Sequence, residues 1–353
     1  MNKNKKIIYN NFIQKNNFKN NKNIIYNCSK IIKKIIENLE TTKDTFHSLS
    51  DKFEFNFRIK DLAKFKNFEK IAIIGMGGSI LGAEAIYSFL IKKLKKKMFF
   101  FNDIDMDQLK EFKKRENLKK ILFIVISKSG STVETLSNFL ALKIIKKGSK
   151  NIIIITEKKD SPLYLLSKKM KLFFIAHKRY ISGRYTVLSE VGMVPAYLMG
   201  VNINNLRKNL TKHFDSKRKK FLKESSVKLS HLLRNKKYKN LIFFNYIPQL
   251  NKFLYWCQQL IAESLGKKNN GFLPVVSPAP KDHHSLLQLY LDGPKDKLFY
   301  IFSSMENDNI KINSKVLKNK IFSNNKTLSQ IKLAQKDAFI KALKKQNIPF
   351  REF

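Results

Sequence analysis

The chain has 353 residues, 43% of them hydrophobic, and this length suits two domains with buried cores. It contains only Cys28 and Cys257, which excludes a disulfide framework and a four-cysteine zinc site and suits a reducing compartment. The apolar runs fall short of the about 18 residues that a membrane-spanning helix needs, and the Lys- and Asn-rich amino terminus lacks the apolar core of a secretion signal. We therefore expect a cytoplasmic protein with no membrane span.

Charge is the most unusual bulk property, because 70 basic and 27 acidic residues give a formal net charge of +43. Taken alone, this charge predicts a polyanion partner. The lysines recur along the whole chain, however, in company with many asparagines and isoleucines, as AT-rich codon usage would produce. We therefore prefer a solvated lysine surface to specific nucleic-acid binding, and we expect its field to attract anionic substrates.

Residues 1–50 alternate short apolar pairs with Lys and Asn, and the apolar spacing over 29–39 fits an amphipathic helix. This pattern predicts a helical arm. From residue 51 to about 200, apolar runs of strand length alternate with helix-like stretches; the runs are 71–74, 98–101, 121–126, 152–155 and 172–175. The alternation predicts a first α/β domain, with a doubly wound parallel sheet that carries helices on both faces.

Residues 201–353 repeat this pattern in a shorter form and predict a second α/β domain of the same kind. A charged helical stretch over 205–234 precedes strand candidates at 241–246, 272–276 and 298–302. The last helix is expected over 329–345, and it runs into Ile348, Pro349 and Phe350.

Glycines cluster around Ser79, where Gly75, Gly77, Gly78 and Gly82 follow a predicted strand and open a predicted helix. Such a turn lets backbone N–H groups face an anion beyond the carboxyl end of the strand. A dinucleotide-binding fingerprint needs glycine at position 80, where this chain has isoleucine, and no P-loop lysine follows. Nucleotide binding is therefore the weaker interpretation, and a turn that only permits close packing stays open.

The next cluster, Ser127, Lys128, Ser129, Ser131 and Thr132, directly follows the strand predicted over 121–126 and precedes a helix. Hydroxyl donors at a helix amino terminus suit a phosphate monoester, because the helix dipole favours negative charge. Capping of the helix would need only one of these hydroxyls. The cluster therefore predicts a phosphate site.

Together, the Gly-x-Gly-Gly-Ser and Ser-Lys-Ser-Gly-Ser-Thr segments resemble the sugar isomerase (SIS) domain. Later segments narrow the resemblance to the glucose-6-phosphate isomerase family: Ser182-Gly183-Arg184-Tyr185 with Ser189-Glu190-Val191-Gly192, Gln258-Gln259 with Glu263-Ser264-Leu265-Gly266-Lys267, and His284-Ser285-Leu286-Leu287-Gln288-Leu289. The resemblance covers residues 70 to 292 in unchanged order. It implies two SIS domains.

Two positions on one predicted helix, Gln259 and Glu263, lie four residues apart and so share a face. A carboxylate there can act as a general base on an acidic C–H. Without the surrounding motif a solvated surface glutamate would be the better interpretation, and the motif favours the catalytic one. Of the two adjacent histidines, only the register of the motif favours His284 over His283. The family's carboxyl-terminal lysine element is absent in its usual form; Lys336 is the best match, with Lys332 and Lys341 as alternatives.

The resemblance implies reversible isomerisation of glucose 6-phosphate and fructose 6-phosphate through a cis-enediolate, as in glycolysis and gluconeogenesis, without cofactor or metal. The residues implied to hold the substrate are Gly78, Ser79, Ser127, Lys128, Ser129, Thr132 and Gln259. Those implied in catalysis are Glu263 as the base at C2, His284 and Lys336 in ring opening, and Arg184 in stabilising the enediolate. The family's histidine enters from a neighbouring subunit, so a homodimer is implied.

Three alternatives stay open at this point. A noncatalytic sugar-phosphate sensor would keep the hydroxyl cluster but could dispense with Glu263 and His284. A polyanion-binding protein would show steeply salt-dependent binding to nucleic acid. A related isomerase would also accept mannose 6-phosphate.

Overall fold

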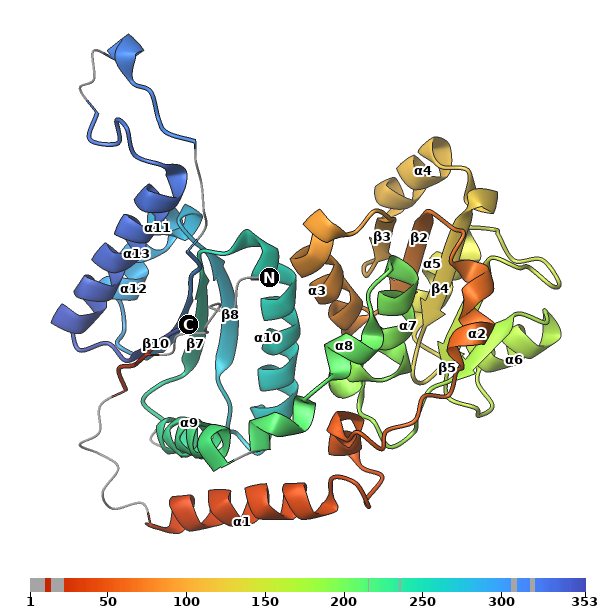
Figure 1. The fold of residues 1–353 in the computed structure, drawn as a ribbon, viewed down its shortest axis with the longest axis horizontal. Coiled ribbons are helices and arrows are strands. Elements are labelled where there is room, and N and C mark those ends of the chain that lie inside the picture. Colours follow the sequence, from red (N-terminus) through yellow and green to blue (C-terminus); the bar gives the residue numbers. More distant parts are fainter. Residues whose placement is uncertain (1–9, 14–21, 215, 235, 306–309, 318–320) are drawn as a thin grey trace. The chain divides into compact units, whose positions relative to one another are not determined.

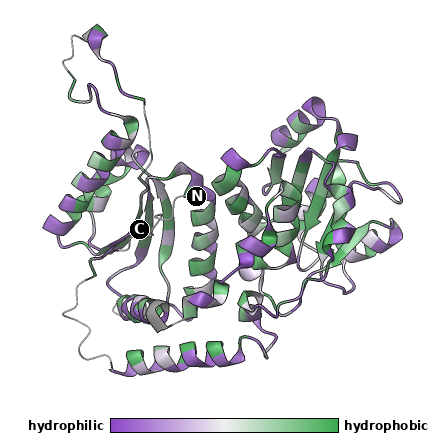
Figure 2. Ribbon diagram, viewed as in Figure 1, coloured by the Kyte–Doolittle hydropathy of each residue, from purple (hydrophilic) through white to green (hydrophobic). Residues whose placement is uncertain are grey.

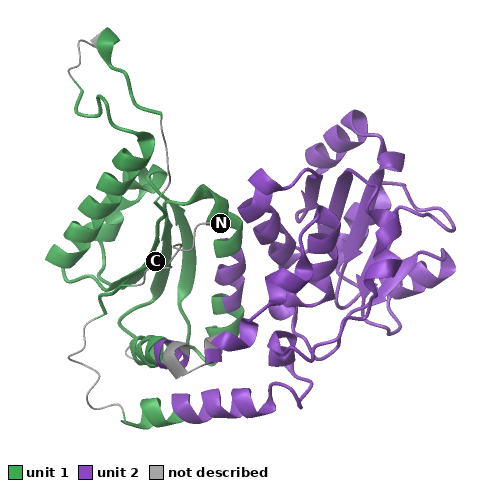
Figure 3. Cartoon of the chain, in the orientation of Figure 1, with its two compact units in different colours: residues 1–27, 224–254, 261–353 green, residues 28–223, 255–260 purple. Residues whose placement is uncertain are grey.

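The computed structural model describes residues 10–13, 22–214, 216–234, 236–305, 310–317 and 321–353 (Figure 1). The chain divides into two compact units, shown in Figure 3. Unit 1 consists of residues 1–27, 224–254 and 261–353, and unit 2 of residues 28–223 and 255–260. Each unit is built around its own sheet of five strands.

The sheet of unit 2 is wholly parallel, with the strand order β3-β2-β4-β5-β6. Its strands are β2 (Lys70–Gly75), β3 (Lys97–Phe101), β4 (Ile121–Ile126), β5 (Ile152–Thr156) and β6 (Phe173–Ala176). All five predicted strands are confirmed, each within one residue at either end. Figure 2 shows these strands as largely hydrophobic, as expected for a parallel sheet that is buried on both faces.

Helices cover both faces of this sheet, as predicted. Alternate residues of β2 face different clusters: Ile71 and Ile73 pack in a cluster with Val191 and Val194 of α7, whereas Ala72 and Ile74 pack in a second cluster. That second cluster contains side chains of α4, α5 and α6. The helices of unit 2, with α1 and α9 extending into unit 1, are α1 (Lys22–Asn38), α2 (Ile59–Leu62), α3 (Leu81–Leu90), α4 (Met106–Arg115), α5 (Val133–Ala141), α6 (Pro162–Lys169), α7 (Glu190–Met199), α8 (Ile203–Arg207) and α9 (Ser216–Arg234).

Short 3-10 helices lie between the longer elements of the chain. They lie at Thr45–Leu49, Ala63–Phe65, Gly77–Ser79, Ile91–Lys93, Leu118–Lys120, Gly183–Leu188, Leu210–Phe214, Pro248–Leu250 and Lys315–Leu317. The ones at Gly77–Ser79 and Gly183–Leu188 contain predicted substrate-binding and catalytic residues. Neither was predicted, because one turn of helix is too short for a periodic signal.

The sheet of unit 1 has the order β1-β10-β9-β7-β8. The predicted strands are confirmed as β7 (Asn240–Asn245), β8 (Leu273–Pro278) and β9 (Lys297–Phe302), all parallel. The sequence missed β10 (Phe350–Glu352), which extends the sheet beside β9, and β1 (Asn10–Asn11), which pairs with β10 in the antiparallel sense. Strands this short carry no recognisable alternation, so pairing with the sheet decides their conformation.

Helices also cover both faces of the second sheet. Phe350 of β10 packs in a cluster with Phe339 and Leu343 of α13, while the next residue, Arg351, donates to Ser225 of α9. Because successive strand residues point to opposite faces, α13 and α9 lie on opposite sides. The remaining helices are α10 (Asn251–Leu265, whose residues 255–260 belong to unit 2), α11 (Lys281–Ser285), α12 (Leu287–Leu291) and α13 (Leu328–Lys345).

Two helix predictions need correction. The charged stretch over 205–234 is not one helix: α8 ends at Arg207, a 3-10 helix covers Leu210–Phe214, and α9 begins at Ser216. Asn209 interrupts the stretch with a φ of 66°, a left-handed conformation that asparagine tolerates better than most residues. In the predicted arm, helix α1 begins at Lys22, earlier than expected; residues 1–9 and 14–21 lie outside the described part.

The length and composition of each helix show whether it could cross a membrane. Within the described ranges, none of the helices combines the length and the apolar character that crossing a bilayer requires.

Candidate functional site

The carboxyl edge of the sheet in unit 2 brings the two predicted phosphate-binding segments together. The glycine-rich turn follows β2 and the hydroxyl cluster follows β4, and these strands are neighbours whose last residues, Gly75 and Ile126, are paired. The chain runs from β2 outward to β3 and then returns to β4 on the other side of β2. Such a switch point at the carboxyl ends of parallel strands is where open α/β sheets bind ligands.

The glycine-rich turn is shaped by a close approach of two backbones. A Cβ atom built on Gly78 would lie 2.1 Å from the carbonyl oxygen of Gly183, so no other residue fits there without moving the chain. Gly77 has a φ of +50°, and a Cβ atom on it would lie 2.8 Å from Nε2 of Gln259. The turn therefore holds Gly78 and Ser79 against the segment that carries Arg184.

The hydroxyl loop is ordered by its own hydrogen bonds. The Ser127 hydroxyl lies 2.8 Å from that of Thr132 and accepts from the backbone N–H of Gly130 at 3.1 Å, while Ser129 accepts from the N–H of Ser131 at 3.2 Å. Gly130 has a φ of +71°, which lets the loop turn back before α5 begins at Val133. Thr132 is the N-cap residue of α5 but makes no side-chain capping bond, so its hydroxyl is directed into the cluster.

Lys128 lies in this loop, but its ammonium turns away from the hydroxyls. Nζ donates to the carbonyl oxygens of Arg179 at 3.0 Å and Ile181 at 2.8 Å, and it lies 3.7 Å from the carboxylate of Glu157. The side chain therefore links the hydroxyl loop to the segment that leads to Arg184.

Arg184 is half-buried in the 3-10 helix Gly183–Leu188. Its guanidinium lies over the ring of Tyr185, 4.8 Å from the centroid, and its carbonyl accepts from Nε1 of Trp256 at 2.9 Å. Trp256 and half-buried Gln259 come from the part of α10 that belongs to unit 2. This part of α10 therefore holds the backbone of the Arg184 segment.

The predicted acid and base residues belong to unit 1. Glu263 is exposed on α10, one turn after Gln259, so the predicted shared helix is confirmed. His284 is exposed on α11, whereas His283 is half-buried, packs against Phe244 and bonds the Tyr246 hydroxyl through Nε2 at 2.7 Å. Burial lowers the pKa of His283. Of the two histidines, His283 thus takes part in the packing of unit 1, whereas His284 is exposed.

Lys336 is engaged by carboxylates in unit 1. Its ammonium lies 2.6 Å from Glu352 of β10 and 3.1 Å from Asp337. Partial burial acts to lower the pKa of Lys336, but the hydrogen bonds and charges of these two carboxylates together outweigh it, so the pKa is raised. Lys341 is exposed on the same helix, and Lys332 is half-buried one turn before Lys336. The structure thus gives Lys336 a local role in holding α13 to β10.

Two residues of unit 2 were not singled out from the sequence. Thr135, one turn after Thr132 in α5, is 1% exposed, and its hydroxyl has no hydrogen-bond partner among the described residues. Thr186, also 1% exposed, lies within hydrogen-bond distance of the carbonyl oxygens of Gly78 (2.9 Å) and Gly183 (2.7 Å). The Ser-Thr-x-x-Thr spacing over 131–135 could have identified Thr135, because residues three apart share a helix face; nothing local identifies Thr186.

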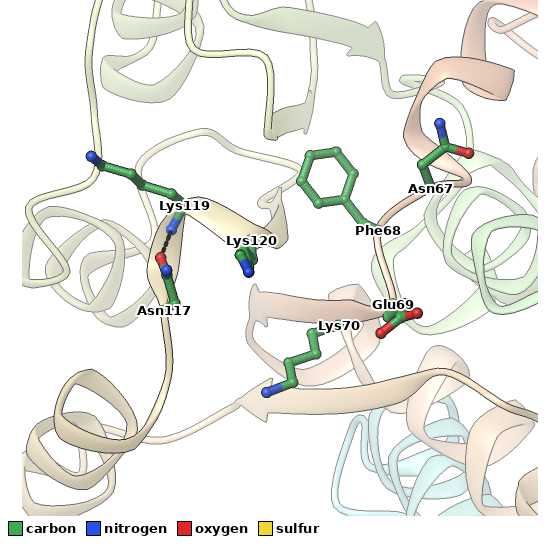
Figure 4. Close-up of a pocket in the computed structure, with 7 residues that line it drawn as sticks. All are labelled: Asn67, Phe68, Glu69, Lys70, Asn117, Lys119 and Lys120. Carbon is green, nitrogen blue, oxygen red and sulfur yellow. Dashed lines mark hydrogen bonds between the residues drawn. The ribbon is translucent and has the colours of Figure 1, made fainter.

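The amino edge of the same sheet has a different character. A cavity of about 400 Å³ there is lined by Asn67, Phe68, Glu69, Lys70, Asn117, Lys119 and Lys120 (Figure 4). Lys119 and Lys120 lie in the last turn of a 3-10 helix, where cations offset the negative end of the helix dipole, and Lys70 pairs with Glu116 at 2.5 Å. Pairing with Lys70 lowers the pKa of Glu116. Among these lysines, Lys70 is thus engaged by a local carboxylate.

Within the described ranges, no group of three or more His, Cys, Asp or Glu side chains is arranged to hold a metal ion. The cysteines Cys28 and Cys257 are both free, and burial raises the pKa of the Cys257 thiol to about 12. The polar groups that meet in the loop after β4 are hydroxyls at the amino terminus of a helix, which are suited to bind an anion.

Comparison with known proteins connects this arrangement to a family. The profile of the family described as phosphoglucose isomerase matches residues 17–340. Among curated proteins, the chain is 33% identical to a glucose-6-phosphate isomerase of Methanocaldococcus jannaschii over 68% of this chain and 62% of the relative. It is 32% identical to a glucose-6-phosphate isomerase of Campylobacter jejuni over 68% of this chain and 61% of the relative.

Solved structures share the fold at lower identity. A hypothetical protein of Thermus thermophilus superposes with a TM-score of 0.74 and 22% identity over 94% of this chain and 84% of that one. A glucose-6-phosphate isomerase of Chlamydia trachomatis superposes with a TM-score of 0.69 and 18% identity over 93% of this chain and 75% of that one. The aligned part of this chain spans less than two thirds of the two curated relatives named above. With a family profile matched over most of its length and relatives above 30% identity, the chain belongs to the phosphoglucose isomerase family.

Proposed function

We propose that this protein interconverts glucose 6-phosphate and fructose 6-phosphate by proton transfer through a cis-enediolate. The observation that carries the proposal is the pairing of the glycine-rich turn with the hydroxyl loop at the switch point of unit 2. The named curated relatives are glucose-6-phosphate isomerases, and their activity supports the same assignment here.

In this proposal, unit 2 binds the phosphate. Ser79, Ser127, Ser129 and Thr132 donate hydroxyl protons to its oxygens, and the amino terminus of α5 adds a favourable dipole. Gly78 permits the close backbone approach. Lys128 contributes position and charge to the loop, without a direct contact between its ammonium and the phosphate. The buried hydroxyl of Thr135, one turn into α5, is suited to serve as a further donor.

The chemistry requires one base and one group that opens the sugar ring. Glu263 takes the proton from C2 and returns it to C1, and Arg184 stabilises the negative oxygen of the enediolate, the kind of preorganised electrostatic contribution that is often largest. His284 moves a proton between the ring oxygen and the hydroxyl, assisted by Lys336, and Gln259 orients the substrate or Arg184. No cofactor or metal is required by this route.

Assembly, location and domain roles are part of the same proposal. The exposure of His284 on α11 supports a homodimer in which this histidine serves a neighbouring subunit. Free cysteines support a cytoplasmic location, where the reaction would serve glycolysis and gluconeogenesis. Residues 51–200 would form the phosphate-binding SIS domain and 201–353 the SIS domain with the acid and base residues, after an arm over 1–50.

The proposal is tested by incubating the purified protein with fructose 6-phosphate and coupling glucose 6-phosphate formation to a dehydrogenase that reduces NADP. We expect steady NADPH formation that depends on enzyme concentration and is lost in Glu263→Gln. A wild-type protein that binds fructose 6-phosphate but forms no product would instead be a noncatalytic sensor. Mannose 6-phosphate in the same assay, with phosphate-ester products resolved by chromatography, tests the substrate range.

A further inference from the structure

The segment that carries Arg184 is not held in place by the sheet. It follows β6, the edge strand, whereas the glycine-rich turn follows β2 and the hydroxyl loop follows β4. Strands β4 and β5 separate β6 from β2, so residues 179–186 must cross the carboxyl edge of the sheet to reach Gly78. Contacts other than strand pairing therefore have to fix this crossing.

Lys128 supplies the first contact. An ammonium has three N–H donors, and in Lys128 two of them are used by the carbonyl oxygens of Arg179 and Ile181 at 3.0 and 2.8 Å. Glu157 lies 3.7 Å from the same nitrogen and balances its charge. Little donor capacity is therefore left for a phosphate, although Lys128 lies between Ser127 and Ser129 in the chain.

Thr186 supplies the second contact, at the other end of the crossing. Its buried hydroxyl shares one proton between the carbonyl oxygens of Gly78 and Gly183, at 2.9 and 2.7 Å. Gly78 and Gly183 lie where the two backbones approach closely, since a Cβ atom on Gly78 would lie 2.1 Å from the Gly183 carbonyl oxygen. A hydroxyl at this position joins the glycine-rich turn to the residue immediately before Arg184.

We propose that Lys128 and Thr186 are positioning residues. They hold the Arg184 segment, residues 179–186, against the hydroxyl loop and the glycine-rich turn, and neither side chain contacts the substrate. The inference rests on the proposed function, in which Arg184 stabilises the enediolate. Binding the phosphate in the hydroxyl loop would then present Arg184 to the developing charge in a preset geometry. A misplacement of about 1 Å in such a group can cost roughly 10²-fold in rate.

The test compares Lys128→Met and Thr186→Val with the wild type, and uses Thr186→Ser, which keeps the hydroxyl, as the conservative variant. Lys159→Met is the matched control, because Lys159 pairs with the same Glu157 at 3.1 Å but contacts neither carbonyl. We expect Lys128→Met and Thr186→Val to lower kcat by about 10- to 100-fold while KM changes by less than about 3-fold, since the lost contribution exists mainly in the transition state. The inhibition constant of inorganic phosphate should stay the same, and Thr186→Ser should restore most of kcat.

Trp256 gives a second readout that needs no activity, because it is the single tryptophan of the chain and its indole donates to the Arg184 carbonyl. A released Arg184 segment should shift the emission of Trp256 in Lys128→Met and Thr186→Val, and leave it unchanged in Lys159→Met. If Lys128→Met does not fold, the comparison of Thr186→Val with Thr186→Ser still tests the proposal.

Three results would overturn the inference. A phosphate inhibition constant raised 10-fold or more in Lys128→Met, with kcat preserved, would make Lys128 a phosphate ligand. Wild-type kcat and an unchanged Trp256 emission in both variants would show that the two contacts are dispensable. An inactive wild type would contradict the proposed function itself, and with it the role given to Arg184.

Discussion

The hydroxyl loop at the carboxyl edge of the sheet in unit 2 and two of the acid and base residues of unit 1, Glu263 and His284, differ in how far their side chains are exposed. In unit 2, the hydroxyl loop is closed by its own hydrogen bonds, and Ser127 is 1% exposed. In unit 1, Glu263 and His284 are exposed on α10 and α11. The hydroxyl loop is therefore preorganised by hydrogen bonds within its own unit, whereas the side chains of Glu263 and His284 are exposed.

The difference follows from the chemistry that each region is proposed to perform. A phosphate keeps the same charge throughout isomerisation, so a rigid set of donors serves the ground state and the transition state alike. A base and a ring-opening acid must instead reach atoms of a substrate that is bound elsewhere. Substitutions in the two regions should accordingly affect different kinetic constants.

The largest effect is expected for Glu263→Gln, which keeps the shape of the side chain and removes the base. It should lower kcat by roughly 10² to 10⁴-fold, for cyclic and open-chain sugar phosphates alike, because proton abstraction follows ring opening. Solvent deuterium incorporation at C2 measures that step directly. Exchange at the wild-type rate would show that Glu263 is not the base. Glu111→Gln, an exposed glutamate that pairs with Arg115 at 2.7 Å, should leave kcat unchanged.

A smaller and more selective effect is expected for His284→Ala. Turnover of cyclic glucose 6-phosphate should fall by about 10²-fold, the lower end for general acid–base catalysis, while an aldose phosphate too short to cyclise should keep much of its rate. His283→Asn is the neighbouring control: it removes the contact with Tyr246 and should lower the melting temperature without separating the two substrates. Equal losses on both substrates in His284→Ala would place this histidine outside ring opening.

Substitutions in the hydroxyl loop should mainly raise KM. Replacing both Ser127 and Thr132 with Ala removes two proposed phosphate donors, and a hydrogen bond to a charged group contributes about 1.5 to 3 kcal/mol. We therefore expect KM for fructose 6-phosphate to rise by roughly 10-fold or more, with a smaller change in kcat. An unchanged KM would remove the phosphate assignment. Ser149→Ala, which loses only a hydroxyl bonded to the backbone of Lys146, should behave as the wild type.

The smallest effect concerns stability of unit 2 as a function of pH. Burial lowers the pKa of His177 from 6.5 to about 4, and the neighbouring Lys128 acts in the same direction. Between these two values the unfolded chain binds a proton that the native chain does not, so the free energy of unfolding should fall as pH is lowered, by at most about 1.4 kcal/mol per pH unit. The contribution is fully present above the unfolded pKa. Denaturant titrations at several pH values give the free energy of unfolding as a function of pH. Its dependence on pH should be weaker in His177→Asn than in the wild type, and equal dependence in the two proteins would contradict a buried neutral imidazole.

Much of the fold could be predicted because parallel strands buried on both faces are continuous apolar runs. The run Ile121–Ile126 is fully buried in β4 and was assigned without error. The elements that escaped prediction are short or interrupted. Phe350–Glu352 forms β10 only because β9 provides a partner, and Asn209 divides a stretch whose composition is helical throughout.

For the candidate site, the sequence by itself determined which residue types follow β2 and β4, because glycine and hydroxyl clusters are local and the carboxyl ends of parallel strands meet at one edge. Tertiary structure alone decided where the Lys128 ammonium is directed and that Thr186 joins Gly78 to Gly183. It also decided which of two adjacent histidines is packed against Phe244 and which faces outward. The physical reason is that a local pattern specifies the backbone turn, whereas the partner of a side chain depends on segments distant in sequence that only the folded chain brings together.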